Sequence, residues 1–569
     1  MRRTLTLALV LVACAACTDN PRGGVAPSEG AIRQQTGVIA TDPAASRGPA
    51  PEVPGAATGG TVTVFRETTL ARLDPQRVYS FLGLSISQLY ARRLTTFADD
   101  GTGKLTLVGD LAETPGTDVN GDCRTWEFRL KENIRFETGA PVTARDIAYG
   151  IARSFDLTLA GGPTYLQEWL SGTPQYDKAF DFAPATTALP PGVETPDDRT
   201  LRLRFPRAQC DLPFAAALPA TSPVPAAADT GLDYDRSPVA TGPYKIEGRT
   251  GDSELRLVRN PQWDPATDAV RHQYPDRFVL SFGADPVAQT NRIMAGQGAD
   301  AASVSFDGVP PSLLARVTGD PALEPRMLRS QTPRLTMMSI NTRRITDVSV
   351  RAALNRAVDR ESLVKAIGGA AVARPLTTLL PPSTIGWRPY DAYPAAPVQV
   401  GEVPELVLAH ADDAEGQIVA TSLATGLRAA GFTVTTKAVP ANEYLVEIQK
   451  ADNPWDLYVD SWAPDWPSGA AVLPALFDGR GIKVDGGNNG TSYLDARPLD
   501  AEFDRITALP IDEQSAQWAA LDEKIMREYA PVVPLYIELT CTIRGPSAGG
   551  LFVDSVFGSL AFVNAFVTP

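Results

Sequence analysis

The residues with the clearest chemical potential lie at positions 456–467, in the sequence DLYVDSWAPDWP. The segment begins as an apolar, β-prone run and ends in a loop that contains two prolines. A carboxylate at a strand end can accept a charge-assisted hydrogen bond, and neighbouring aromatic rings strengthen that bond by excluding water. The segment therefore favours a site for a small cationic or amphipathic ligand. The structural alternative is that Trp462 belongs to the core and Asp465 is a solvated turn residue.

Other kinds of site have little support in this sequence. The only histidines are His272 and His410, and neither has the spacing to a second His or Cys that a zinc site or a His-based acid–base pair requires. We expect no metal and no cofactor. The motif GPSAG at 545–549 satisfies the G-x-S-x-G pattern of serine hydrolases, but neither a helix-like sequence nor a later His follows it. An exported serine hydrolase is therefore a remote alternative, and we expect no enzymatic activity.

Length and composition indicate a large globular protein. A chain of 569 residues is too long for one ordinary core, so we expect two or more lobes. The composition, 44% hydrophobic and 21% charged, is that of a globular chain. The formal net charge is −14, and because no basic block offsets it, nucleic acid is not expected as a partner.

The first residues resemble an export signal with a lipidation site. Two arginines precede a short apolar run, which is too short to span a bilayer. LVAC at 11–14 matches the bacterial lipobox, and the overlapping CAAC at 14–17 is a second match, so either Cys14 or Cys17 is the expected lipidated residue. We assign residues 1–16 to the signal peptide and residues 17–58, rich in Gly, Pro, Ala and Ser, to a disordered tether.

Export permits disulfides, and three cysteines follow the signal: Cys123, Cys210 and Cys541. Cys123 leads into the strand-like TWEFRL at 125–130, and Cys210 follows the strand-like TLRLRF at 200–205. If these strands pair antiparallel, a bridge between Cys123 and Cys210 is geometrically reasonable. Cys541 would then be a buried thiol.

Local patterns predict several elements of the folded body. A first strand is expected at 59–65, and Leu73-Asp74-Pro75 predicts a helix start. Another helix should begin at Thr143, where the spacing to Asp146 resembles a capping box. A third helix is expected after Asp347. Strand, helix and strand patterns at 405–409, 418–430 and 432–435 form a βαβ unit, which implies a parallel sheet.

These blocks, in this order, resemble the large oligopeptide/dipeptide-binding family of extracytoplasmic solute-binding lipoproteins of ABC importers (bacterial extracellular solute-binding proteins, family 5). The resemblance covers nearly all of the chain after the tether. Its blocks are GGTVTV at 59–64, LDP at 73–75, WEFRL at 126–130, FETGAPVTARD at 136–146, TGPY at 241–244, RNP at 259–261, DVSVRAALNRAVDRE at 347–361 and APVVPLY at 530–536.

The resemblance implies a mixed α/β, two-lobe fold of the periplasmic-binding-protein-like type II class. Lobe I would comprise residues 59–330 and 535–569, with an extra subdomain at about 91–239. Lobe II would comprise residues 331–534. The chain would cross between lobes near 331–333 and 531–534, and ligand would bind between the lobes and close them about this hinge.

The resemblance also implies ligand-binding residues. In peptide-binding members, an acid three residues after a Trp pairs with the α-amino group of the peptide, which corresponds here to Trp462 and Asp465. Residues after the LDP block line the pocket, which corresponds to Tyr79 and Phe81. Lys450 lies where oligopeptide binders carry a base that can meet a peptide carboxylate, although a solvated surface Lys is equally compatible. The expected set is completed by Trp466, Asp460 and Ser339.

The chain departs from the oligopeptide binders in two ways. Asp460 adds an acid before Trp462, and Val459 lies where those proteins can carry Arg. Both changes suit a more cationic or non-peptide ligand. The leading interpretation is a monomeric, lipid-anchored receptor on the outer face of the cell membrane, or a periplasmic one, that delivers a peptide or other small solute to a permease and its ATPase. The same fold binding a non-peptide solute, or acting as a regulator of the envelope without transport, stays open.

Overall fold

The computed structural model describes residues 36–99, 104–184, 188–397 and 404–568. The predicted signal peptide, both candidate lipidation residues Cys14 and Cys17, and positions 17–35 of the predicted tether lie outside this part. Within the described ranges, no helix combines the length and the apolar character needed to cross a membrane.

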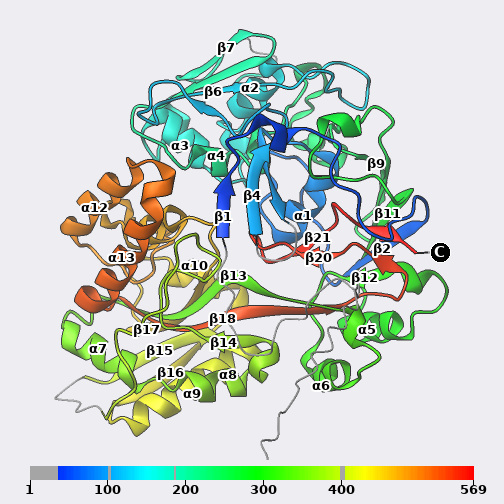
Figure 1. The fold of residues 1–569 in the computed structure, drawn as a ribbon. Coiled ribbons are helices and arrows are strands. Elements are labelled where there is room, and N and C mark those ends of the chain that lie inside the picture. Colours follow the sequence, from blue (N-terminus) through cyan, green and yellow to red (C-terminus); the bar gives the residue numbers. More distant parts are fainter. Residues whose placement is uncertain (1–35, 100–103, 185–187, 398–403, 569) are drawn as a thin grey trace, which may run out of the picture. The chain divides into compact units, whose positions relative to one another are not determined.

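The described chain is a mixed α/β protein (Figure 1). The helices are α1 (Phe81–Tyr90), α2 (Ala144–Arg153), α3 (Tyr165–Ser171), α4 (Leu212–Ala215), α5 (Pro286–Ala295), α6 (Pro311–Gly319), α7 (Val348–Ala357), α8 (Arg360–Ala366), α9 (Ala414–Ala429), α10 (Ala441–Ile448), α11 (Leu473–Phe477), α12 (Arg497–Thr507) and α13 (Ile511–Tyr529).

The largest sheet has the strand order β14-β18-β13-β17-β15-β16. Its strands are β13 (Met327–Ile340), β14 (Ala373–Pro375), β15 (Leu406–Ala411), β16 (Val434–Val439), β17 (Leu457–Trp462) and β18 (Val532–Ile543). β15 and β16 are parallel and joined by α9, which confirms the predicted βαβ unit. α7 confirms the helix predicted after Asp347, and the Asp347 side chain caps it by accepting the Ser349 N–H.

Two long strands, β13 and β18, run side by side and antiparallel through this part of the molecule (Figure 1). Their pairing is irregular between Gln331 and Leu335, the stretch that contains Pro333. This interruption lies at the first predicted crossing, and it faces Leu539 and Ile537 of β18. The second predicted crossing, 531–534, lies where β18 begins to pair with the end of β13. The division into two lobes stays a prediction.

The sheet that begins the folded body has the order β12-β2-β11-β10-β9. Its strands are β2 (Thr61–Arg66), β9 (Tyr244–Thr250), β10 (Glu254–Arg259), β11 (Arg277–Phe282) and β12 (Ser303–Ser305). Buried residues of α1 pack against the apolar face of this sheet in one core cluster. β2 confirms the predicted first strand, and its last residue, Arg66, borders the candidate site described below.

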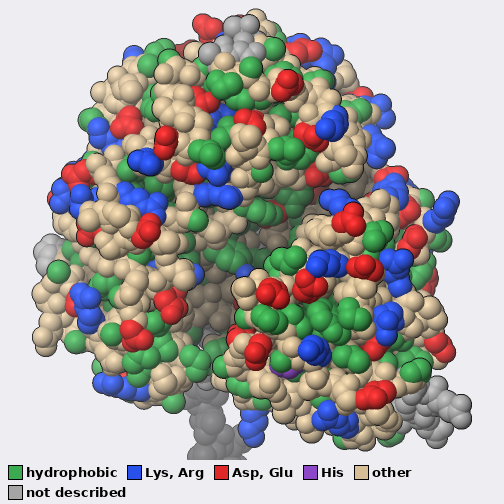
Figure 2. Space-filling model, turned by 180° about the vertical axis from the view of Figure 1, so that it is seen from behind, with side chains coloured by type: hydrophobic (Ala, Val, Ile, Leu, Met, Phe, Trp, Pro, Cys, Tyr) green, Lys and Arg blue, Asp and Glu red, His purple; other side chains and the backbone are tan. Residues whose placement is uncertain are grey.

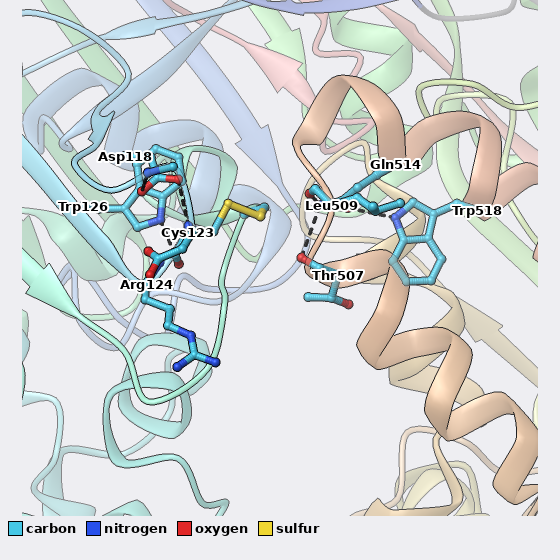
Figure 3. Close-up of a disulfide and its surroundings, with 11 residues drawn as sticks. Asp118, Cys123, Arg124, Trp126, Thr507, Leu509, Gln514 and Trp518 are labelled. Atoms are coloured by element: carbon cyan, nitrogen blue, oxygen red, sulfur yellow. Dashed lines mark hydrogen bonds between the residues drawn. A yellow bond between two sulfur atoms is a disulfide. The ribbon is translucent and has the colours of Figure 1, made fainter.

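A separate four-stranded sheet has the order β5-β6-β8-β7 and packs against α2. Its strands are β5 (Thr117–Asp118), β6 (Thr125–Arg129), β7 (Val193–Asp197) and β8 (Thr200–Arg204). β6 and β8 pair antiparallel, and a disulfide joins Cys123 to Cys210 (Figure 3), as predicted. The Asp118 carboxylate accepts the Cys123 N–H at 2.7 Å, so the bridge is held by the neighbouring turn as well. Cys541 is a buried free thiol.

A third sheet has the order β1-β4-β3, with β1 (Thr36–Ile39), β3 (Thr95–Asp99) and β4 (Lys104–Gly109). β1 pairs in parallel with β4, and Ser46 is buried with its hydroxyl accepting the Gly109 N–H. The structure thus differs from the predicted tether at 36–58, because backbone pairing orders a stretch whose composition alone indicates a loop. Two further pairs are β19 (Ala548–Gly549) with β22 (Phe566–Val567) and β20 (Phe552–Val553) with β21 (Leu560–Ala561).

The predicted helix start at Asp74-Pro75 is wrong. Residues 75–77 form a turn, and α1 begins only at Phe81, with Ser80 as its N-cap. The Asp74 carboxylate is buried and accepts a hydrogen bond from Arg153 at 2.6 Å. Its other oxygen accepts the Gln76 N–H at 3.2 Å, so Asp74 caps this single turn and also pairs with Arg153.

Candidate functional site

Asp465 is the centre of the candidate site. It lies in the loop after β17, and only 8% of its surface is exposed. Its Oδ2 accepts two hydrogen bonds, from the Tyr79 hydroxyl at 2.6 Å and from the Tyr165 hydroxyl at 2.5 Å. The two phenols come from segments about 300 and 400 residues earlier, so the site exists only in the folded chain.

Local structure positions the two phenols. Tyr79 immediately precedes Ser80, the N-cap of α1, and Tyr165 is the first residue of α3. The Tyr165 ring packs edge-on against the Trp466 indole, with ring centres 4.7 Å apart, and lies tilted against Trp169 on the next turn of α3. This aromatic packing restricts the phenol and keeps its hydroxyl on the carboxylate.

Burial controls the protonation states in the site. Loss of solvent raises the pKa of Asp465, and the two phenol hydrogen bonds partly offset that rise because they stabilise the carboxylate. Desolvation and the adjacent carboxylate raise the pKa of Tyr165; they also raise the pKa of Tyr79, whose hydroxyl lies against Asp465 although 45% of the Tyr79 surface is exposed. Both phenols therefore remain protonated and act as hydrogen-bond donors at neutral pH.

A cavity of about 390 Å³ borders this carboxylate. Its walls come from the end of β2 and the loop after it, the start of α1, and the loop after β17. The lining residues are Arg66, Thr68, Thr69, Leu70, Ala71, Tyr79, Ser80, Phe81, Leu82, Leu84, Phe306, Ala463, Pro464, Asp465 and Phe557. Figure 2 shows that the face opposite to the view of Figure 1 is deeply hollowed near its centre.

The structure brings three predicted site residues, Tyr79, Phe81 and Asp465, to this cavity. The two predicted tryptophans do not line the cavity. Trp466 is buried and its indole N–H donates to the Asp211 carboxylate at 2.7 Å. Trp462 is partly buried and donates to the Ala471 carbonyl at 2.9 Å.

The other three predicted residues do not line this cavity. Ser339 and Asp460 lie on the neighbouring strands β13 and β17, and the Thr491 hydroxyl bonds to both side chains, at 2.8 and 2.7 Å. Burial raises the pKa of Asp460 to about 6. Lys450 is half-exposed and pairs with Glu447 at 2.6 Å, one turn earlier.

Several residues of the site were not predicted from the sequence, chiefly Tyr165, Arg66 and Phe306. The Tyr165–Trp169 pair is an i, i+4 aromatic pair typical of helix packing, and nothing in its spacing points to Asp465. Arg66 ends a regular strand, where a charged residue usually indicates no more than the edge of a sheet. No local signal could have identified these residues.

Comparisons with known proteins agree with this architecture. The model of the bacterial extracellular solute-binding proteins, family 5 (middle), matches residues 106–483. The chain belongs to this family. The predicted resemblance is thereby confirmed.

Two curated relatives match most of the chain. The periplasmic oligopeptide-binding protein OppA of Salmonella typhimurium is 23% identical over 499 residues, covering 81% of this chain and 86% of that protein. The heme-binding protein A of Haemophilus influenzae is 24% identical over 521 residues, covering 84% and 87%.

Among solved structures, the clavulanic acid biosynthesis oligopeptide binding protein 2 superposes with a TM-score of 0.82. It is 28% identical, and the superposition covers 90% of this chain and 96% of that one. The fold is therefore the mixed α/β, type II fold of the periplasmic binding proteins, as predicted.

Proposed function

We propose that this protein is the extracytoplasmic receptor of an ABC importer and that it binds a peptide or peptide-like solute without altering it chemically. The observation that carries the proposal is the buried Asp465 carboxylate, held by two phenols at the edge of a cavity. A buried acid beside a cavity is suited to recognise a cation, because solvent competes weakly for it.

The ligand's ammonium group would bind at Oδ1 of Asp465. Tyr79 and Tyr165 both donate to Oδ2, and among the described residues none donates to Oδ1. The phenols hold the carboxylate in one orientation before the ligand arrives, which reduces the entropic cost of binding. Phe81, Phe306 and Phe557 supply apolar walls that exclude water from the charge pair.

Closure of two lobes over the ligand is part of the proposal. Tyr79 and Tyr165 belong to the proposed lobe I, whereas Asp465 and Trp466 belong to the proposed lobe II. Their mutual contacts, with the Trp466–Asp211 bond, would form in the closed state and break on opening. The irregular pairing of β13 and β18 near Gln331 is the proposed hinge.

The finer cellular assignments rest on the sequence. The lipobox at Cys14 or Cys17 would anchor the mature protein by its acyl chains to the outer face of the cell membrane. The receptor would act as a monomer and deliver its solute to a permease and ATPase. The curated relatives include both an oligopeptide-binding and a heme-binding protein, so a non-peptide solute is the second candidate.

Native mass spectrometry of the purified protein, followed by calorimetric titration of the ligand-free form, tests the proposal. We expect a co-purified mass that corresponds to a peptide and is lost on unfolding, and micromolar or tighter binding of peptides with a free amino terminus. A co-purified tetrapyrrole, with no peptide binding, would support the second candidate instead.

A further inference from the structure

The cavity beside Asp465 also contains a base, Arg66, at the end of β2. We infer that Arg66 binds the carboxylate of the same ligand whose ammonium binds Asp465, and that the ligand is a compact zwitterion such as a dipeptide. This inference rests on the proposed function and extends it, because it assigns a second recognition group and a size class.

The surroundings of Arg66 hold its guanidinium in place. Its Nε donates to the Thr68 hydroxyl at 3.1 Å, and its Nη1 pairs with the Asp307 carboxylate. Asp307 is itself fixed, because its other oxygen accepts the Glu67 N–H at 2.7 Å. The guanidinium also lies over the Phe306 ring, 5.6 Å from its centre.

These contacts leave donors for a ligand. An arginine has five N–H groups in a planar fork. Within the described part of the chain, no acceptor bonds to Nη2 of Arg66. A guanidinium that is preorganised and only partly occupied is well suited to bind a carboxylate. Asp307 offsets the positive charge of Arg66. The selectivity for a carboxylate would therefore come from the geometry of the remaining N–H donors of Arg66 and not from long-range electrostatic attraction.

The lining of the cavity combines two polar groups with apolar surface. Asp465 with its phenols supplies one polar group, and Arg66 with Thr68 supplies the other, whereas Leu70, Phe81 and Phe557 provide apolar surface. Its volume of about 390 Å³ is near the lower end of the range of about 300–1,000 Å³ for small-molecule sites. A ligand with both charges and a short apolar body satisfies all three features, whereas a long peptide would not fit within this cavity.

The experiment titrates the ligand-free full-length protein with the dipeptide Ala-Phe, its C-terminal amide, its N-acetyl derivative and a nonapeptide with free termini. We expect amidation to weaken binding at least tenfold and the nonapeptide to bind at least tenfold more weakly than Ala-Phe. In Arg66→Gln, Ala-Phe should bind as weakly as its amide, whereas the affinity for the amide should not change. Arg256→Gln, an arginine of comparable exposure on β10 outside the cavity, is the matched control.

The outcomes separate this inference from the proposed function. Loss of binding on N-acetylation with no effect of amidation would overturn the role of Arg66 and leave the Asp465 site intact. Tight binding of the nonapeptide alone would overturn the size class. Failure of every peptide to bind would remove the proposed function and this inference together. Because the amide comparison uses wild-type protein, the test does not depend on whether Arg66→Gln folds.

Discussion

The indole N–H of Trp466 donates a 2.7 Å hydrogen bond to the carboxylate of Asp211, 255 residues earlier in the chain. Each of these two residues is the sequence neighbour of another residue discussed above. Asp211 follows the disulfide residue Cys210, and Trp466 follows Asp465. The bond therefore connects the disulfide-bridged region to the loop that carries the proposed ligand anchor.

We predict that Trp466→Phe lowers the free energy of unfolding by about 2 kcal/mol, because the buried Asp211 carboxylate loses one of its two side-chain donors and keeps only Ser468. Urea denaturation measures the change. A double-mutant cycle of Trp466→Phe and Asp211→Asn should give a coupling free energy of about 1–2 kcal/mol. Strictly additive effects would show that the bond contributes nothing specific.

Asp465→Asn should weaken the binding of peptides with a free amino terminus by about 100-fold, or about 3 kcal/mol, because the buried charge pair is lost. The amide retains an oxygen that can accept the two phenol hydrogen bonds, so the fold should persist. Its stability should not fall, since burial raises the pKa of Asp465 and thus disfavours the ionised form. Calorimetric titration tests the affinity, and the exposed Asp181→Asn is the control. Unchanged affinity would remove Asp465 from the proposed site.

A third prediction concerns pH. Asp522 on α13 is buried and accepts the N–H groups of Leu379 and Leu380 and the Tyr390 hydroxyl, yet burial raises its pKa to about 7. Between pH 4 and 7 the folded protein keeps a proton on this group that the unfolded chain releases. The free energy of unfolding therefore falls as the pH rises from 4 towards 7, and the contribution of Asp522 to this loss is on the order of 4 kcal/mol.

The measurement compares unfolding of the wild type and Asp522→Asn across this range. The unfolding free energy of Asp522→Asn minus that of the wild type should increase as the pH rises from 4 to 7. Other buried acids titrate in the same range, so only this difference, and not the wild-type curve, is informative. A difference that does not vary between pH 4 and 7 would contradict the raised pKa.

Removal of the disulfide by Cys123→Ser with Cys210→Ser should destabilise the protein by about 4 kcal/mol, because the bridge closes a loop with a sequence separation of 87. Thermal and urea unfolding with and without a reductant test this. Reductant should destabilise the wild type and leave the double variant unaffected. An equal response of both proteins would point to a cause other than this bridge.

The lipid anchor has its own test in metabolic labelling of a bacterial host with a fatty-acid analogue. Because the two candidate cysteines lie three residues apart, Cys14→Ser and Cys17→Ser are compared with each other and with wild type. One substitution should abolish labelling and release the protein from the membrane fraction, whereas the other should do neither. Retained labelling in a protein that carries both changes would contradict lipidation at this site.

The sequence alone determined the features that depend on near neighbours. Thr143 and Asp146 predict the start of α2, and there the Asp146 carboxylate accepts the Thr143 N–H at 2.8 Å. The alternation in residues 125–130 and 200–205 predicted β6 and β8, and hence a possible bridge. These features were predictable because their hydrogen bonds and side-chain periodicity arise within a few residues.

Only the tertiary structure decided which distant groups meet. Asp74 has the local pattern of a helix cap, but it caps only a single turn, and its second oxygen pairs with the buried guanidinium of the distant Arg153. Tyr165 and Arg66 resemble a helix aromatic and a strand-end charge, yet the fold brings both to the cavity beside Asp465. Removal from solvent strengthens these electrostatic interactions between distant residues. Whether a group is removed from solvent depends on the packing of the whole chain and not on the local sequence.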